Sequence, residues 1–216
     1  MKLKSYLNSF GLLLVLTGIV APNLILSNPG NAASTSIAAT SSKWRKFSPP
    51  GGDFSILMPA TPKKESETED AINPKTGKME KKTEYSFTVD NLNGQDGTVY
   101  IVSYFDSSAT TLITSSTQED LDIGLNIASS LIEAQSPGLI QRKQKLRLNG
   151  NPGTEIKLGF KDEKSGQSAT LWTRVFCTRR PNNQIRTYQV VAFSMKEQAL
   201  QRTLEGFFNS FKLIDK

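Results

Sequence analysis

Apolar and polar residues alternate along much of the chain, and this alternation predicts a series of β-strands. Residues 54–58 form a short strand that ends at Pro59. Residues 63–82 carry many charges and few apolar side chains. They predict a solvated hairpin whose second arm continues into the alternating segment 85–89. Residues 99–105 are apolar at odd and even positions alike, which predicts a central strand covered on both faces.

Helical periodicity is found in two segments. In the first, apolar residues recur at helical spacing from Leu121 to Ile132. Ser116 and Glu119 form a capping box ahead of this helix, and the helix ends before Pro137. The second segment predicts an amphipathic helix near the C-terminus. Its apolar stripe consists of Leu200, Leu204, Phe207, Phe208 and Phe211.

Between the two helices the pattern returns to strands. The expected strands cover residues 139–148, 156–160, 169–178 and 185–193. Residues 149–153, with the sequence Asn-Gly-Asn-Pro-Gly, predict the turn between the first two of these strands. Strands, a helix, strands and a helix predict an α+β fold, in which helices pack on a mainly antiparallel β-sheet.

The N-terminal segment predicts export. Lys2 and Lys4 precede an apolar run, and the small residues at 30–33 follow it, as in a secretory signal peptide that is cleaved after Ala32. An uncleaved membrane anchor is the alternative. However, the apolar run from residue 12 to 26 is shorter than the ~20 residues that a spanning helix needs.

The chain is therefore divided into a signal peptide (1–32), a flexible leader (33–42) and a single domain (43–216). After cleavage, we expect no spanning segment. The expected compartment is the periplasm or the thylakoid lumen, with the extracellular space as a further alternative. The formal charge of +6 becomes +4 when Lys2 and Lys4 are removed, because 24 basic and 20 acidic residues remain. This charge is too small and too dispersed to predict a nucleic-acid partner.

The chain contains no histidine and only one cysteine, Cys177, which limits the kinds of catalytic and metal-binding site that it can form. Serine and cysteine nucleophiles usually need a histidine base, and zinc sites need several cysteine or histidine ligands. Neither a Ser-x-x-Lys helix start nor a G-x-S-x-G elbow is present. The acidic residues at 90–97 do not fit a calcium loop, because Leu92 and Gly94 occupy ligand positions. We expect no catalytic residue, no metal and no cofactor, and we interpret Cys177 as a buried small apolar residue.

Basic residues are the candidate binding surface. Lys143, Lys145 and Arg147 share one face of a strand, and Arg179, Arg180 and Arg186 flank a turn. If those strands are neighbours, the six side chains form a cationic patch for an acidic partner or a membrane surface. The alternative is an ordinary charged strand face. Trp172 and Phe176 flank Arg174 and suit either a stacked interface or the core.

Four segments carry a resemblance to known proteins. They are Trp44-x-x-Phe47 with Pro49-Pro50-Gly51-Gly52, the run 54–59, the corner 148–155 and the ending 207–213. Together they resemble a largely uncharacterised group of exported proteins from cyanobacteria and planctomycetes, and the order of elements is similar to that of the PsbP/Mog1-like α/β sandwich. PsbP-type proteins assist photosystem II in the thylakoid lumen, and Mog1 binds a small GTPase. The resemblance therefore implies a non-catalytic docking module.

Two functional hypotheses follow. The first is an exported, non-enzymatic module that binds a protein partner, which is acidic or membrane-associated, and assists a membrane or photosynthetic complex. The second is an extracytoplasmic small-molecule or lipid-binding protein, or an enzyme, with a pocket between sheet and helices. Tyr100, Tyr104 and Tyr188 could line that pocket. A filled interface between sheet and helices would favour the first hypothesis, and an apolar cavity the second.

Overall fold

The computed structural model describes residues 44–72, 79–91, 97–108, 118–135, 138–161, 168–181, 184–195 and 201–214. The expected signal peptide (1–32) and leader (33–42) lie outside these residues, as do Ser116 of the expected capping box and Leu200 of the expected C-terminal helix.

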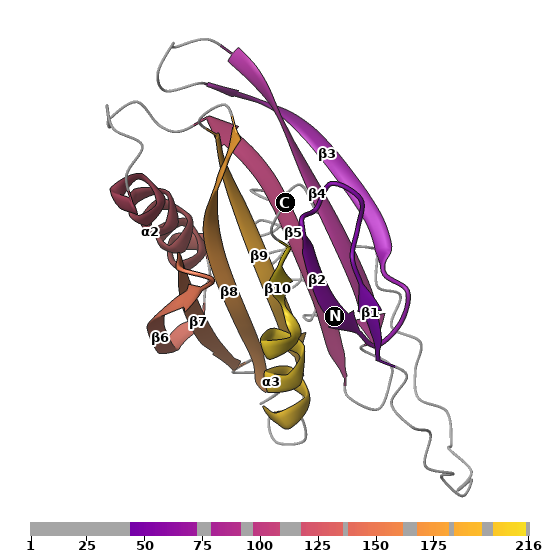
Figure 1. Ribbon diagram of the computed structural model, residues 1–216. Helices are drawn as coiled ribbons and strands as arrows, with labels where there is room; N and C mark the ends of the chain where they lie inside the picture. The colour runs from indigo at the N-terminus through magenta and orange to yellow at the C-terminus, as the bar shows by residue number, and fades with distance from the viewer. Residues whose placement is uncertain are drawn as a thin grey trace, which may run out of the picture.

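Seven long strands form the main sheet. They are β3 (Lys63–Ile72), β4 (Met79–Asn91), β5 (Thr98–Ser108), β6 (Leu139–Leu148), β7 (Asn151–Lys161), β8 (Ser168–Arg180) and β9 (Gln184–Ser194). Their order is β3-β4-β5-β9-β8-β7-β6, and every neighbouring pair is antiparallel. The pairing of β5 with β9 joins the two halves of the chain at the centre of the sheet (Figure 1). The apolar residues on both faces of β5 are explained by this central position.

Each face of the main sheet has its own cover. The small sheet of β1 (Arg45–Phe47), β2 (Phe54–Met58) and β10 (Lys212–Leu213) covers one face together with α3 (Gln201–Ser210). The other face is covered by α2 (Gln118–Gln135), which contacts β7, β8 and β9. We call these the α3-side and α2-side faces. The predicted α+β fold, with helices on a mainly antiparallel sheet, is confirmed.

The length of α2 suits its place in the topology. The strand β6 lies four positions from β5 in the sheet, or about 19 Å at the usual strand spacing. A helix of 18 residues is about 27 Å long, enough to carry the chain across the sheet while burying an apolar stripe against it. Within the described residues, neither helix combines the length and the hydrophobicity needed to cross a membrane.

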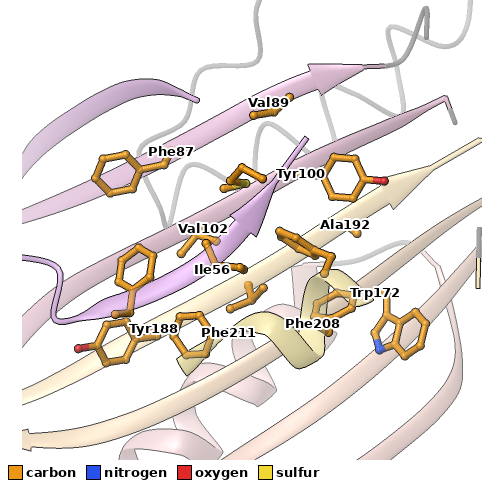
Figure 2. Close-up of a cluster of buried hydrophobic side chains, with 14 of the residues drawn as sticks. Ile56, Phe87, Val89, Tyr100, Val102, Trp172, Tyr188, Ala192, Phe208 and Phe211 are labelled. Atoms are coloured by element: carbon orange, nitrogen blue, oxygen red, sulfur yellow. The ribbon is translucent and has the colours of Figure 1, made fainter. Parts of the chain in front are cut away.

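Two hydrophobic clusters fill the interfaces on either side of the sheet. The α3-side cluster is rich in aromatic rings (Figure 2). Tyr100 meets Phe207 edge to face at 5.0 Å between ring centroids, and Phe176 stacks on Phe211 at 5.6 Å. The α2-side cluster is mainly aliphatic. Because residues of β5, β8 and β9 contribute to both clusters, the centre of the sheet is buried on both faces.

Two element boundaries differ from the sequence prediction. The turn expected at 149–153 consists of Asn149 and Gly150 alone, whose φ values of 51° and 78° fit a two-residue hairpin loop. Residues 151–153 belong to β7 instead. Gly153 is required there by packing, since an added Cβ would lie 2.4 Å from Cδ1 of Phe176. The helix α3 ends at Ser210, so Phe211 enters the core from the following segment.

Candidate functional site

The register of the main sheet divides the six candidate basic residues between its two faces. Lys145 is paired with Thr154, which is paired with Val175 of the α2-side cluster. By alternation, Lys143, Lys145 and Arg147 all belong to the α2-side face. The neighbours Arg179 and Arg180 point to opposite faces. Arg179 joins the α2-side group, whereas Arg180 and Arg186 lie on the α3-side face with Trp172 and Tyr188.

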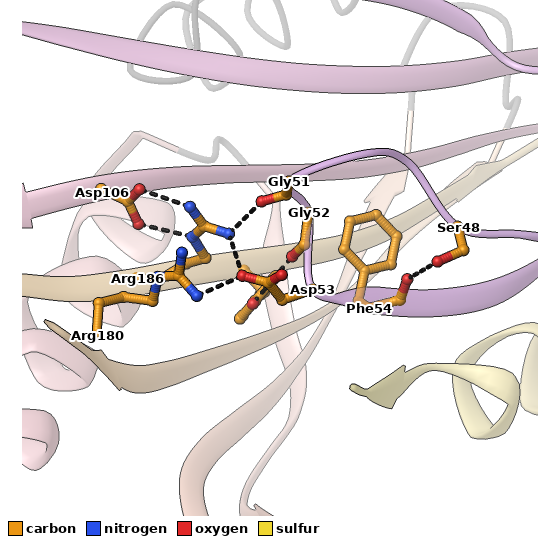
Figure 3. A network of polar contacts seen from close by, with 9 residues as sticks. Ser48, Gly51, Gly52, Asp53, Phe54, Asp106, Arg180 and Arg186 are labelled. Carbon is orange, nitrogen blue, oxygen red and sulfur yellow. Dashed lines mark hydrogen bonds and ion pairs between the residues drawn. The ribbon is translucent and has the colours of Figure 1, made fainter. Parts of the chain in front are cut away.

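Arg180 and Arg186 take part in an ion-pair network with two aspartates (Figure 3). Arg186 is 4% exposed and donates from Nε and Nη2 to the two carboxylate oxygens of Asp106, both at 2.6 Å. Its Nη1 donates to the carbonyl oxygen of Gly51 at 2.6 Å and to Oδ2 of Asp53 at 3.1 Å. Arg180 donates to the same carboxylate oxygen of Asp53. The charges of both arginines are therefore engaged in ion pairs within the fold.

The surroundings of Arg186 keep it charged. Burial alone lowers the pKa of a guanidinium, but the hydrogen bonds and charge of Asp106 outweigh burial and raise the pKa of Arg186 above its ordinary value. The ring of Tyr104 lies 4.6 Å from the guanidinium carbon and adds a cation–π contact. Burial raises the pKa of Tyr188, whose hydroxyl donates to the carbonyl oxygen of Gly52 at 3.0 Å. The arrangement stabilises the charge of Arg186.

The network fixes the start of the domain onto the sheet. Gly51 and Asp53 have φ values of 75° and 55°, so the turn before β2 uses the left-handed region twice. Their partners Arg180 and Arg186 come from the ends of β8 and β9, and Arg186 is in turn held by Asp106 from the end of β5. The interactions therefore join segments more than 120 residues apart in sequence. The main effect of the network is structural, because it holds the turn before β2 in one position on the main sheet.

The α2-side cations have more exposed positions. Lys143 Nζ lies 2.5 Å from Glu133 Oε1 of α2, and Arg179 Nη2 lies 4.0 Å from Asp120 Oδ2 at the start of that helix. Lys145 and Arg147 are exposed, and no ion pair to either is found among the described residues. Arg147 donates from Nη1 to the carbonyl oxygen of Gly150 at 3.0 Å, which holds its side chain along the hairpin.

Sequence reasoning missed two exposed aliphatic residues at the start of β6. Leu139 is 81% exposed and Ile140 is 50% exposed. The strand is the last one in the main sheet, and a register shift between Ile140 and Arg142 interrupts its pairing with β7. Consecutive aliphatic residues directly after a Pro-Gly pair were the available signal, since strict alternation would bury only one of them. We call Leu139, Ile140, Lys145 and Arg147 the β6 surface. By the register, Leu139 lies on the α3-side face of this edge strand and the other three lie on its α2-side face.

The two aromatic neighbours of Arg174 belong to the interior of the fold, and Arg174 itself is partly buried. Trp172 and Phe176 lie in the α3-side cluster, as the core alternative predicted. Arg174 Nε donates to Oε2 of Glu155 at 2.7 Å, and its guanidinium carbon lies 5.2 Å from the ring centroid of Phe208. Glu155 is 1% exposed and also accepts from Nε2 of Gln144 at 3.1 Å, so its carboxylate is stabilised by protein partners and not by solvent.

The three tyrosines proposed to line a pocket are packed into the same core. Tyr100, Tyr104 and Tyr188 are at most 5% exposed and make ring contacts with neighbouring aromatic side chains. Cys177 is fully buried, as predicted, and burial raises the pKa of its thiol to about 11. Among the described residues, no group of three or more acidic, cysteine or histidine side chains is placed to hold a metal ion.

Comparisons with known proteins give likeness in structure alone. No protein family matches the sequence, and no curated protein matches it. The solution structure of cyanobacterial PsbP (CyanoP) from Synechocystis has a TM-score of 0.40 and 11% identity, and the match covers 83% of this chain and 98% of that chain. LpqN, involved in cell envelope biogenesis of Mycobacterium tuberculosis, has a TM-score of 0.41 and 9% identity, with 71% and 86% covered.

A protein of unknown function from Pseudomonas aeruginosa has a TM-score of 0.31 and 8% identity, with 68% and 81% covered. A PsbP is thus among the structures to which the chain is similar. Identities of 11% or less show no family membership.

Proposed function

We propose that this protein is an exported, non-catalytic accessory module that binds a protein partner through the β6 surface. Its partner presents acidic groups together with an apolar contact. The single observation that carries this proposal is the composition of β6, an edge strand with two exposed aliphatic residues at one end and two cations without ion pairs among the described residues at the other.

The chemistry of this surface supports contact with another protein. Burying exposed aliphatic side chains against a partner favours binding by roughly 25 cal/mol per Å² of apolar area removed from water. The cations Lys145 and Arg147 add orientation and a faster association rate more than affinity. They also discourage other strands from pairing with the open edge of β6, so binding through side chains is favoured over sheet extension. Arg180 and Arg186 are excluded from the proposed surface because Asp53 and Asp106 occupy them.

The non-catalytic part of the proposal rests on composition and burial. The chain has no histidine, and its one cysteine is fully buried with a pKa raised to about 11. Export rests on the signal-peptide pattern in residues 1–32. Turnover of a substrate by the purified protein would contradict the first point, and retention of the full chain in the cytoplasm of its host would contradict the second.

Affinity capture with charge-reversed variants tests the β6 surface. The tagged protein is expressed in its host and captured at about 0.1 M and about 1 M salt, where the screening length falls from about 10 Å to about 3 Å. We expect Lys145→Glu with Arg147→Glu to lose a partner that the wild type retains, and we expect the same partner to be weakened at high salt. Leu139→Ser should weaken capture at both salt concentrations.

The matched control is Lys64→Glu with Lys81→Glu, which reverses two exposed charges on the hairpin at the other edge of the main sheet. Its change in net charge is identical. Retention of the partner by this control supports a local surface at β6. Equal loss in both double variants, or no loss in either, would contradict the proposal.

A further inference from the structure

The small sheet and α3 enclose a groove of about 420 Å³ on the outer side of the molecule. The residues that line it include Ile56 and Leu57 of β2 and Gly206 and Ser210 of α3. In Figure 1, β2, β10 and α3 lie side by side in front of the main sheet. The volume falls in the range of about 300–1,000 Å³ that is usual for binding sites. The groove is remote from the β6 surface, which lies at the edge of the main sheet.

The groove exists because β10 is too short to pair with the whole of β2. Only Lys212 and Leu213 pair with β2, opposite Ser55 and Phe54. Beyond them, the N–H group of Leu57 donates to Oγ of Ser210 at 2.9 Å, so a side chain of α3 replaces a strand partner. Gly206 keeps the wall low, since a Cβ added there would meet no atom within 4 Å.

The side chains around the groove point to a ligand with carboxylates. Lys46 is paired with Leu57 and Lys212 with Ser55, so the two lysines flank β2 from its two neighbouring strands. Both lysines are exposed and line the groove. Among the described residues, no acidic side chain lines it, and neither lysine forms an ion pair. Strands two positions apart are about 9.5 Å from each other, a span that one extended peptide segment can bridge.

Neutral groups of the lining suit the remainder of such a segment. Leu57 is 39% exposed and offers an apolar contact at the centre of the groove. Asn209 accepts from Nη1 of Arg174 through Oδ1 at 3.0 Å, which leaves its amide nitrogen as a donor toward a peptide carbonyl. Exposed lysines alone give little affinity in water, so the aliphatic contact is needed beside them.

We propose that this groove binds an extended acidic peptide segment of a partner protein, in which two acidic residues flank an aliphatic residue at alternate positions, so that all three side chains lie on one face. The aliphatic side chain contacts Leu57 above Gly206, and the carboxylates contact Lys46 and Lys212. This contact is separate from the β6 surface and does not depend on the function proposed for it. A free carboxylate amphiphile would share part of the chemistry, but a groove open along the surface fits a chain segment better.

Titration with short labelled peptides tests the proposal. The probe is an acetylated Gly-Glu-Ser-Leu-Ser-Glu-Gly peptide, its control has glutamine at both glutamate positions, and octanoate serves as the free amphiphile. Binding is followed by fluorescence anisotropy and by backbone NMR shifts of the full domain. We expect the Glu peptide to bind with shift changes at β2, β10 and α3, and the Gln peptide to bind about threefold to tenfold more weakly.

Three variants make the test specific. Gly206→Leu fills the groove at an exposed helix position and should abolish binding. Lys46→Gln with Lys212→Gln should weaken binding of the Glu peptide to the level of the Gln peptide. Lys145→Gln with Arg147→Gln alters the β6 surface and should leave binding unchanged. Unaltered binding to Gly206→Leu, equal binding of the two peptides, no binding at all, or tighter binding of octanoate would each overturn the proposal.

Discussion

At the scale of single residues, Asp53 combines an unusual backbone with a buried charge. Its φ of 55° lies in the left-handed region, which aspartate enters more readily than most residues but still at a cost. Its side chain is 8% exposed and accepts from Arg180 and Arg186. The interactions of the carboxylate offset the backbone cost, so one side chain both permits the turn and joins it to β8 and β9.

Replacing the carboxylate without changing the backbone separates these two roles. Asp53→Asn keeps a side chain that tolerates positive φ but removes the negative charge beside two arginines. Because Arg186 retains Asp106, we expect a loss of about 1–3 kcal/mol in the free energy of unfolding, and not the full effect of an unpaired buried charge. Urea denaturation at pH 7 measures this loss. The control Asp70→Asn removes the exposed ion pair with Lys81 and should cost less than about 0.5 kcal/mol.

Equal destabilisation by the two asparagine variants would contradict this account. It would mean that the network at the start of the domain contributes no more than an ion pair on the surface of the charged hairpin.

At the scale of elements, alternation along the sequence predicted which strands are buried, but it did not predict their neighbours. The apolar faces of β5 indicated a central strand because each face of that strand meets its own hydrophobic cluster. The order of the strands depends on how α2 crosses the sheet and on the pairing of β5 with β9, two non-local choices that leave no local pattern. The expectation of one patch of six cations depended on that order.

Short elements were also beyond sequence reasoning. β10 has two residues, too few for any periodicity, yet it completes the small sheet and helps to form the groove. The groove residues Lys46, Gly206 and Lys212 come from three elements, and only the fold brings them together. By contrast, the fate of Cys177 was predictable, because it stands at an apolar position of a regular strand.

Replacing two glycines in open surroundings by alanine should change the free energy of unfolding in opposite directions, because one lies in a turn and the other in a helix. A Cβ at Gly150 or Gly206 would meet no atom within 4 Å, so packing has no part in either substitution. Gly150 has a φ of 78° in a hairpin turn, and Gly150→Ala should lower the free energy of unfolding by about 1 kcal/mol. Gly206 lies within α3, and Gly206→Ala should raise it by about 0.5–1 kcal/mol through helix propensity.

Chemical denaturation of both variants beside the wild type provides the comparison. Changes of the same sign would show that the hairpin or the helix does not have the backbone geometry described.

At the scale of the whole molecule, the two ends of the described chain complete one layer. β2 near the N-terminus pairs with β10 near the C-terminus, and the N–H group of Ile214 donates to the carbonyl oxygen of Asp53 at 2.9 Å. Phe211 is 3% exposed, stacks on Phe176 and contacts the rings of Phe54 and Tyr188. The cover of the α3-side face therefore cannot form until both ends of the domain are in place.

If residues 43–216 form a single domain, weakening this cover must destabilise the α2-side face equally. Phe211→Ala should lower the free energy of unfolding by about 3–5 kcal/mol, since it removes a buried aromatic ring. Both tryptophans, Trp44 and Trp172, lie on the α3-side face, whereas most of the described helix is α2 on the other face. Tryptophan fluorescence and helical circular dichroism therefore report on different layers. In a two-state transition both signals should shift together to lower denaturant.

The control Ile214→Ala truncates a 44% exposed side chain three residues further on and should cost well under 1 kcal/mol. A fluorescence transition that moves alone in Phe211→Ala, with the dichroism unchanged, would show that the small sheet and α3 unfold as a separate unit. In that case the main sheet with α2 and the small sheet with α3 would be only weakly coupled through the buried rings between them. The β6 surface would then stay folded even when the groove is not formed.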